Sequence, residues 1–193
     1  MRNRLILLAA IGVGSLVAAM AALAGNPNFL RYNDATLVYG GTSASTLKLS
    51  STAAGAGADA SFSDPRVFVD GIVVVGVKEG ASTTLTAKYE AVYVCVNGGG
   101  NAPSAANKVT LVGEFDTSAV FPAAKNGRAE GSLLTQPLPS AAEAAAATGF
   151  ACPSGQTLSF DQVVFSGLVL SIDGGEVVQL STRLVSQSVH GLG

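Results

Sequence analysis

The feature that most constrains the fold is a strict alternation of residue character along residues 83–96, TTLTAKYEAVYVCV. Every second residue from Leu85 to Cys95 is apolar or tyrosine, whereas Lys88 and Glu90 fall between them. A period of two residues is that of a β-strand with one buried face. We therefore expect a long strand here, with both of its tyrosines and the cysteine directed into the core.

Shorter runs of β-branched and aromatic residues fill much of the remaining chain. The candidate strands are residues 36–39, 46–50, 66–69, 72–78, 83–96, 108–115, 127–135, 157–165, 168–172 and 176–185. Asp70-Gly71, Asn126-Gly127 and Asp173-Gly174-Gly175 accept the positive φ of tight hairpin turns. Strands at this spacing predict an all-β fold, an antiparallel β-sandwich of immunoglobulin-like architecture.

One segment, PLPSAAEAAAATGFAC, departs from the strand pattern. Ser140 and Glu143 have the spacing of a capping box, alanine is the best helix former, and Gly149 can end a helix in the left-handed conformation. We expect one short inserted helix over residues 141–148, with an alanine-rich loop without helix as the alternative.

The chain opens with the layout of a secretory signal peptide. Arg2 and Arg4 precede an uncharged apolar run that ends in Ala22-Leu23-Ala24. We expect cleavage after this run and a secreted, extracellular protein, while a retained membrane anchor is the alternative because the run is long enough to span a bilayer. Removing the signal peptide, residues 1–24, from the 193 leaves 169 residues, which fits a single domain over residues 25–193.

The net charge of the chain limits which classes of binding partner are expected. Without the leader the chain keeps 9 of its 11 Lys and Arg against 13 Asp and Glu, so its formal charge is near −4. Nucleic acids and anionic membrane surfaces bind clustered positive charge, so we expect neither as a partner of the exported protein.

The only two cysteines are Cys95 and Cys152. An oxidising compartment favours a disulfide between them, with two free buried thiols as the alternative. The bridge would close 56 intervening residues, which in the chain-entropy model contributes about 4 kcal/mol. A zinc site is not expected, since His190 is the only histidine and zinc needs further ligands.

The stretch YVCVNGGGNAPSAANK carries the most motif-like pattern in the chain. It lacks the Lys and Ser or Thr of a phosphate loop and is followed by a strand, so no nucleotide cofactor is expected. Functional loops gather at the ends of sandwiches. The candidate binding loop therefore consists of Asn97, Gly99, Gly100, Asn101 and Asn107, with a plain structural turn as the alternative.

Catalytic residues are not identifiable. His190 lies in a polar tail and is expected to be solvated, whereas a triad needs a histidine fixed by packing. The acids that could form a hydrolytic pair are scattered over several runs: Asp70, Glu90, Glu114, Asp161 and Asp173. A calcium site at Asp173-Gly-Gly-Glu176 offers two carboxylates where six to eight oxygens are needed, so a turn is favoured there.

Three elements form a wider pattern: a Cys-x-Asn-x-Gly-Gly-Asn loop, an Asn-Gly turn and a Cys-Pro-x-Gly-Gln element. The matching positions are Cys95, Asn97, Gly99, Gly100, Asn101, Asn126, Gly127, Cys152, Pro153, Gly155 and Gln156. Over residues 83–172 the chain therefore resembles a group of small secreted proteins of bacteria and fungi that have no established activity. The resemblance implies secretion, paired cysteines and an insertion at residues 141–148, and it transfers no catalytic residue.

These observations predict a secreted, non-enzymatic protein of structural, adhesive or binding function, whose partner is an extracellular protein or glycan. Apolar runs such as GIVVVGV also allow self-association if a strand edge stays open. Two alternatives remain open: a carbohydrate-binding module of a secreted system, weakened by the absence of Trp, and a hydrolase with an unrecognised acidic pair.

Overall fold

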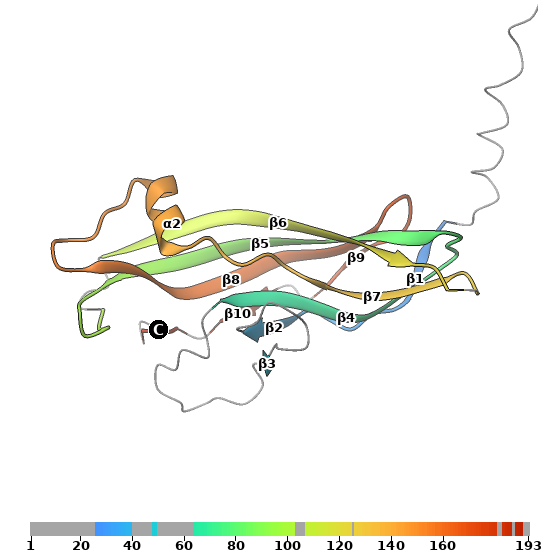
Figure 1. The fold of residues 1–193 in the computed structure, drawn as a ribbon, viewed down its shortest axis with the longest axis horizontal. Coiled ribbons are helices and arrows are strands. Elements are labelled where there is room, and N and C mark those ends of the chain that lie inside the picture. The colour runs from blue at the N-terminus through green and yellow to red at the C-terminus, as the bar shows by residue number, and fades with distance from the viewer. Residues whose placement is uncertain are drawn as a thin grey trace, which may run out of the picture.

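Two antiparallel β-sheets pack face to face and form an elongated sandwich (Figure 1). The computed structural model describes residues 26–39, 48–49, 64–102, 107–124, 126–180, 183–186 and 188–190. The expected signal peptide, residues 1–24, lies outside this part of the chain. Within the described residues no helix combines the length and the apolar character that a membrane crossing requires.

The larger sheet is built around the strand that the alternating pattern predicts. β5 (Gly80–Val96) lies between β6 (Lys108–Pro122) and β8 (Thr157–Ile172). The far edge of β8 is covered by two short strands in succession, β9 (Val177–Gln179) and β10 (Arg183–Val185).

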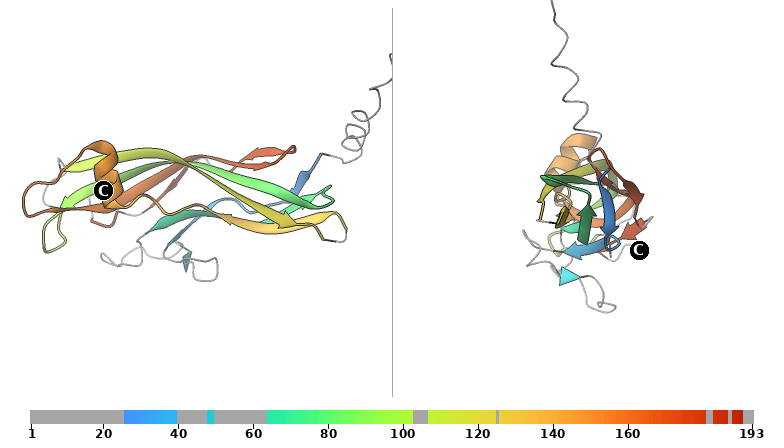
Figure 2. Two further views of the ribbon diagram at one scale, coloured as in Figure 1. Left: turned by 45° about the horizontal axis from the view of Figure 1, so that its top comes forward. Right: turned by 90° about the vertical axis from the view of Figure 1, so that its right-hand side faces the viewer.

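The smaller sheet is built around β4 (Pro65–Val75). One edge of β4 pairs with β7 (Arg128–Leu134), and the other edge pairs with β1 (Asn28–Arg31) and β2 (Thr36–Tyr39) in succession. β3 (Lys48–Leu49) adds to β2. Two views from other directions show β6 and β7 meeting at one end of the sandwich and helix α2 (Ala141–Thr148) at the other (Figure 2).

The hairpin turn predicted at Asp70-Gly71 is wrong, because β4 runs straight through these residues. The pairing with β7 shifts by one residue between Val69 and Ile72, so the glycine, at φ 62°, lies in a β-bulge. Asn33 fixes the bulge from outside, since its side-chain amide donates to an Asp70 carboxylate oxygen at 2.6 Å. β7 pairs with β4 on both sides of the bulge along one edge, and β2 and β1 pair before and after it along the other, so the segment stays in the sheet.

A second bulge joins two other predicted strands. Residues 157–165 and 168–172 form the single strand β8, and Gly167, at φ 57°, lies where the pairing with β5 shifts. By contrast, the predicted turns at Asn126-Gly127 and Asp173-Gly174 are confirmed, with positive φ at both glycines.

The core follows the alternating pattern. Tyr89 and Tyr93 are buried as expected, and Val94 and Val96 are buried on the second face near the end of β5. The largest fully buried side chains come from both sheets: Tyr93, Phe165, Ile72, Leu85, Leu133, Leu168, Leu170, Val38, Val67, Val69, Val73 and Val74. Burial of side chains of this size contributes about 1.5–3 kcal/mol each, so the interface between the sheets dominates stability.

The structure confirms an all-β antiparallel sandwich with one short helix and one disulfide. The helix spans the predicted residues, with a complete capping box at Ser140 and a left-handed Gly149 at its end. The disulfide joins Cys95, which is fully buried, to Cys152 over a Cα–Cα distance of 5.6 Å. It ties the segment after the helix to the end of β5.

Candidate functional site

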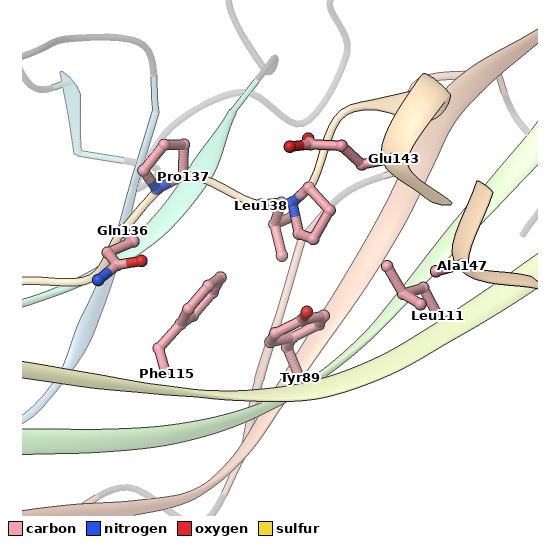
Figure 3. A pocket seen from close by; sticks show the side chains of 9 residues that line it. Tyr89, Leu111, Phe115, Gln136, Pro137, Leu138, Glu143 and Ala147 are labelled. Atoms are coloured by element: carbon pink, nitrogen blue, oxygen red, sulfur yellow. The ribbon is translucent and has the colours of Figure 1, made fainter. Parts of the chain in front are cut away.

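An open groove of about 470 Å³ lies where the smaller sheet no longer covers the larger one (Figure 3). Its floor comes from β5 and β6, and its opposite wall comes from the segment after β7 and from helix α2. The lining residues are Tyr89, Leu111, Phe115, Gln136, Pro137, Leu138, Pro139, Glu143 and Ala147.

The floor of the groove is a stacked aromatic pair. The rings of Tyr89 and Phe115 lie 4.7 Å apart at an interplanar angle of 27°. Tyr89 lies directly over Gly113, its cross-strand neighbour on β6, and a Cβ at that glycine would overlap with the tyrosine ring and hydroxyl. The absent side chain therefore lets Tyr89 lie flat on the sheet. Burial raises the pKa of the Tyr89 hydroxyl, which stays a neutral donor at physiological pH.

The opposite wall is a short strap, residues 136–139, that leads from β7 to the helix. Two prolines restrict its backbone, and the hydroxyl of Tyr93 donates to the carbonyl of Pro139. Burial, with smaller contributions from the charges at Tyr89 and Glu143, raises the pKa of Tyr93 to about 12. The strap is therefore fastened to β5 by a partly buried hydrogen bond that persists at neutral pH.

The helix is held in place by its first turn and by one buried side chain. The Glu143 carboxylate accepts from the Ser140 hydroxyl and from the Ser140 backbone N–H, both at 2.7 Å, and these bonds lower the pKa of Glu143. Ala144 is fully buried in the core. The helix therefore packs towards the interior of the sandwich rather than over its outer face.

Strand β6 borders the groove and has an unpaired edge. Among the described residues, β6 pairs with β5 alone over its whole length. The bond from the Cys95 N–H to the Asn107 carbonyl, at 2.9 Å, fixes which residues face β5. Odd-numbered residues of β6 bond to β5, so the N–H and C=O groups of even-numbered residues point outward. Val112 and Val120, at 68% and 72% exposure, are among these even-numbered residues.

The predicted binding loop is a tight turn at the end of β5. The side-chain oxygen of Asn97 accepts from the N–H groups of Gly99 and Asn101 at 3.0 and 3.1 Å, and Gly100 has φ 77°. Asn107 closes the base of the loop through the bond to Cys95. Residues 103–106 lie outside the described residues. The loop residues in the described part are exposed apart from Asn107, and none of them lines the groove.

The expectation that His190 is a solvated tail residue is wrong. Its ring nitrogen Nε2 lies 3.2 Å from the Ser159 hydroxyl, and its backbone N–H donates to a carboxylate oxygen of Asp161 at 2.9 Å. The same oxygen accepts from Ser188 at 2.6 Å. The buried Asp161 thus fastens the end of the chain to β8. Because it binds the backbone rather than the ring of His190, it does not orient the imidazole as in a triad.

The five acids considered for hydrolysis do not line the groove, nor a smaller groove of about 150 Å³ on the other side of the strap. Asp161 holds the tail, and Asp70 holds the bulge of β4. Glu90 and Glu114 are exposed on the outer face of β5 and β6, where Glu90 lies opposite Val112 and Glu114 opposite Lys88, and Asp173 is exposed in the turn after β8. In the described residues no three His, Cys, Asp or Glu side chains gather as metal ligands would.

Comparison of the chain with protein-family models, with curated proteins and with solved structures gives no match in any of the three. The arrangement of the site is therefore interpreted from its own chemistry. The sequence patterns predicted neither the groove nor which strand keeps an open edge. The proline-containing residues QPLP, between β7 and helix α2, were a signal for the groove in the sequence. The position of Tyr89 over Gly113, however, can be recognised only when the register of β5 and β6 is known.

Proposed function

We propose that this chain is a secreted, non-enzymatic structural or adhesive protein with an immunoglobulin-like sandwich, which binds an extended segment of an extracellular protein along β6. The observation that carries the proposal is the edge of β6 that pairs with no strand of the described residues and lies beside an apolar groove. An added strand forms main-chain hydrogen bonds with such an edge, and its alternate side chains enter neighbouring pockets.

The open edge is unusual in its length and composition. Natural proteins protect edge strands by shortness, proline, bulges or many charges. β6 extends over 15 residues, pairs with β5 without a bulge, and has its only proline at its last position. Lys108, Glu114 and Asp116 are its only charged residues. An edge of this kind favours strand addition.

Two observations favour a protein over a glycan as the ligand. Sugar-binding surfaces offer exposed aromatic side chains, whereas Tyr89 and Tyr93 are buried and Phe115 is 9% exposed. The groove also opens beside unpaired backbone groups, which recognise a peptide. None of the five candidate acids lines the groove, which argues against the hydrolase alternative. The disulfide suits an oxidising, extracellular setting, in agreement with the proposed signal peptide.

The test uses a proline at Val112, whose N–H points away from β5. Val112→Pro removes one outward donor without removing a hydrogen bond to β5, and proline is tolerated on such an edge. Val112→Thr is the matched control, because it keeps the N–H and the β-branched shape. The exported protein and both variants are applied to arrays of extracellular proteins and glycans.

We expect protein ligands to be bound by the unchanged protein and by Val112→Thr, and lost with Val112→Pro, while all three proteins give the same circular dichroism spectrum. Binding to glycans alone would overturn the proposal. Equal binding of a protein ligand by the proline variant would show that the edge of β6 is not the site.

A further inference from the structure

We infer that the extended segment taken up by β6 is the β6 strand of a second copy of this chain, paired antiparallel about a two-fold axis through Val112. The inference rests on the proposed function and names its partner. It follows from three properties of β6: the direction of its free hydrogen-bonding groups, the order of its charges, and the character of its inner face.

The hydrogen-bonding groups allow only certain registers. Since the free N–H and C=O groups belong to even-numbered residues, two copies must place even-numbered residues opposite one another. With the two-fold axis at Val112, this residue lies opposite itself, and each copy contributes residues 108–116. Every free backbone group of this segment then meets a complementary group of the second copy.

Opposite charges pair in two of the allowed registers. The register centred on Leu111 joins Lys108 to Glu114 and pairs residues 108–114 only. The register centred on Val112 pairs residues 108–116 and is the longer of the two. It places Lys108 of each copy opposite Asp116 of the other, which gives two opposite-charge pairs, and it places Glu114 opposite Thr110. Registers centred on Glu114, on Asp116 or between them would instead place carboxylates directly opposite each other. Opposite-charge pairing of the outer face is therefore confined to the first half of β6, which contains its only lysine.

The inner face of β6 is also complementary to itself in this register. Odd-numbered residues face inward, so Val109 of the second copy lies beside Phe115, and Leu111 of the second copy lies beside Gly113. Both incoming side chains are apolar and reach the mouth of the groove. The exposed Val112, the one apolar side chain on the outer face of residues 108–116, meets its own copy across the axis.

The first experiment tests the charge pairs in the exported protein by sedimentation velocity. We expect a dimer whose dissociation constant rises about tenfold with Lys108→Glu, because two attractive cross-strand pairs become repulsive. The double variant Lys108→Glu/Asp116→Lys restores the pairs with exchanged signs and should return the constant to within about threefold of the original. Lys78→Glu, in the exposed loop between β4 and β5, makes the same change of charge away from the edge and should leave the dimer unaffected.

The second experiment measures the register with spin labels at two equally exposed valines. Labels at Val112→Cys should lie within about 15 Å of each other, since directly opposite residues of an antiparallel pair are about 5.5 Å apart. Labels at Val120→Cys should lie about 50 Å apart, because each is eight residues from the axis and a strand rises about 3.4 Å per residue.

The pairing of two β6 strands is supported if the protein forms a concentration-dependent dimer that the double variant restores. The spin labels must also be close together at residue 112 and far apart at residue 120. A monomer at all concentrations overturns the inference, while loss of an array ligand with Val112→Pro would still uphold the proposed function. A dimer that persists with Val112→Pro also overturns the inference, because the association would then use another surface, whereas the proposed function fails only if that variant still binds an array ligand as well as the unchanged protein does.

Discussion

Removal of the disulfide offers a quantitative test of how this sandwich is stabilised. The bridge joins positions 57 residues apart, and constraining an unfolded chain over a loop of that length is worth about 4 kcal/mol. The folded state should survive reduction, because β5 and β8 pair up to the position of the bridge without its help. Cys95 lies opposite Leu158, and Val96 lies opposite Thr157. The effect therefore acts mainly on the unfolded state. Net stabilities of domains are about 5–15 kcal/mol, so this loss is a large share.

The assay is urea unfolding followed by far-ultraviolet circular dichroism, which suits a chain without tryptophan. Oxidised and reduced samples of the same protein isolate the bridge without any change of side chain, and Cys95→Ala/Cys152→Ala is the second comparison. With a slope of about 2 kcal/mol per molar urea, the midpoint should fall by about 2 M on reduction. A difference in the free energy of unfolding below about 1 kcal/mol would refute the entropic reasoning, as would loss of the β-sheet spectrum on reduction before any urea is added.

Three further predictions concern the groove. Gly113→Ala should destabilise the protein by about 1–3 kcal/mol, because the added methyl group overlaps with Tyr89. In a protein that already carries Tyr89→Leu, the same substitution should cost less than about 0.5 kcal/mol. If the free-energy costs of the two substitutions simply add in urea unfolding, the contact between the two residues is refuted. Absorbance titration of the phenols should find one tyrosine that ionises near pH 12 and is absent from Tyr93→Phe. Since the folded pKa lies above the unfolded value of 10, its contribution to stability should be complete below pH 10 and should fall as the pH rises towards 12; a pH-independent stability over that window would contradict this. Ser140→Ala should cost about 1 kcal/mol by removing the cap, whereas Ala146→Ser at an exposed helix position should cost less, and equal losses would argue against the capping box.

Much of the fold could be predicted because its patterns are local. The alternation along residues 83–96 depends only on the two-residue period of a strand, and it correctly placed Tyr89 and Tyr93 in the core. The helix was located to the residue, since a capping box and a terminal glycine involve positions only a few residues apart.

Other predictions failed where the local structure depends on contacts with residues that are distant in the sequence. Asp70-Gly71 has the composition of a hairpin turn, yet the pairing of β4 with its neighbouring strands before and after these residues holds them in the sheet as a bulge. His190 looked like a tail residue because the buried carboxylate that holds it, Asp161, is 29 positions away in the chain.

The sequence by itself therefore determined the strand and helix patterns and the two cysteines available for a bridge. Only the tertiary structure decided that Tyr89 lies over Gly113, that a strap and a helix replace the second sheet above it, and that one edge of β6 has no partner strand among the described residues. The physical reason is that alternation and capping arise from neighbouring residues, whereas a groove and an open edge depend on the register and order of strands. Register is set by contacts between distant segments, so it appears only when the whole sandwich is assembled.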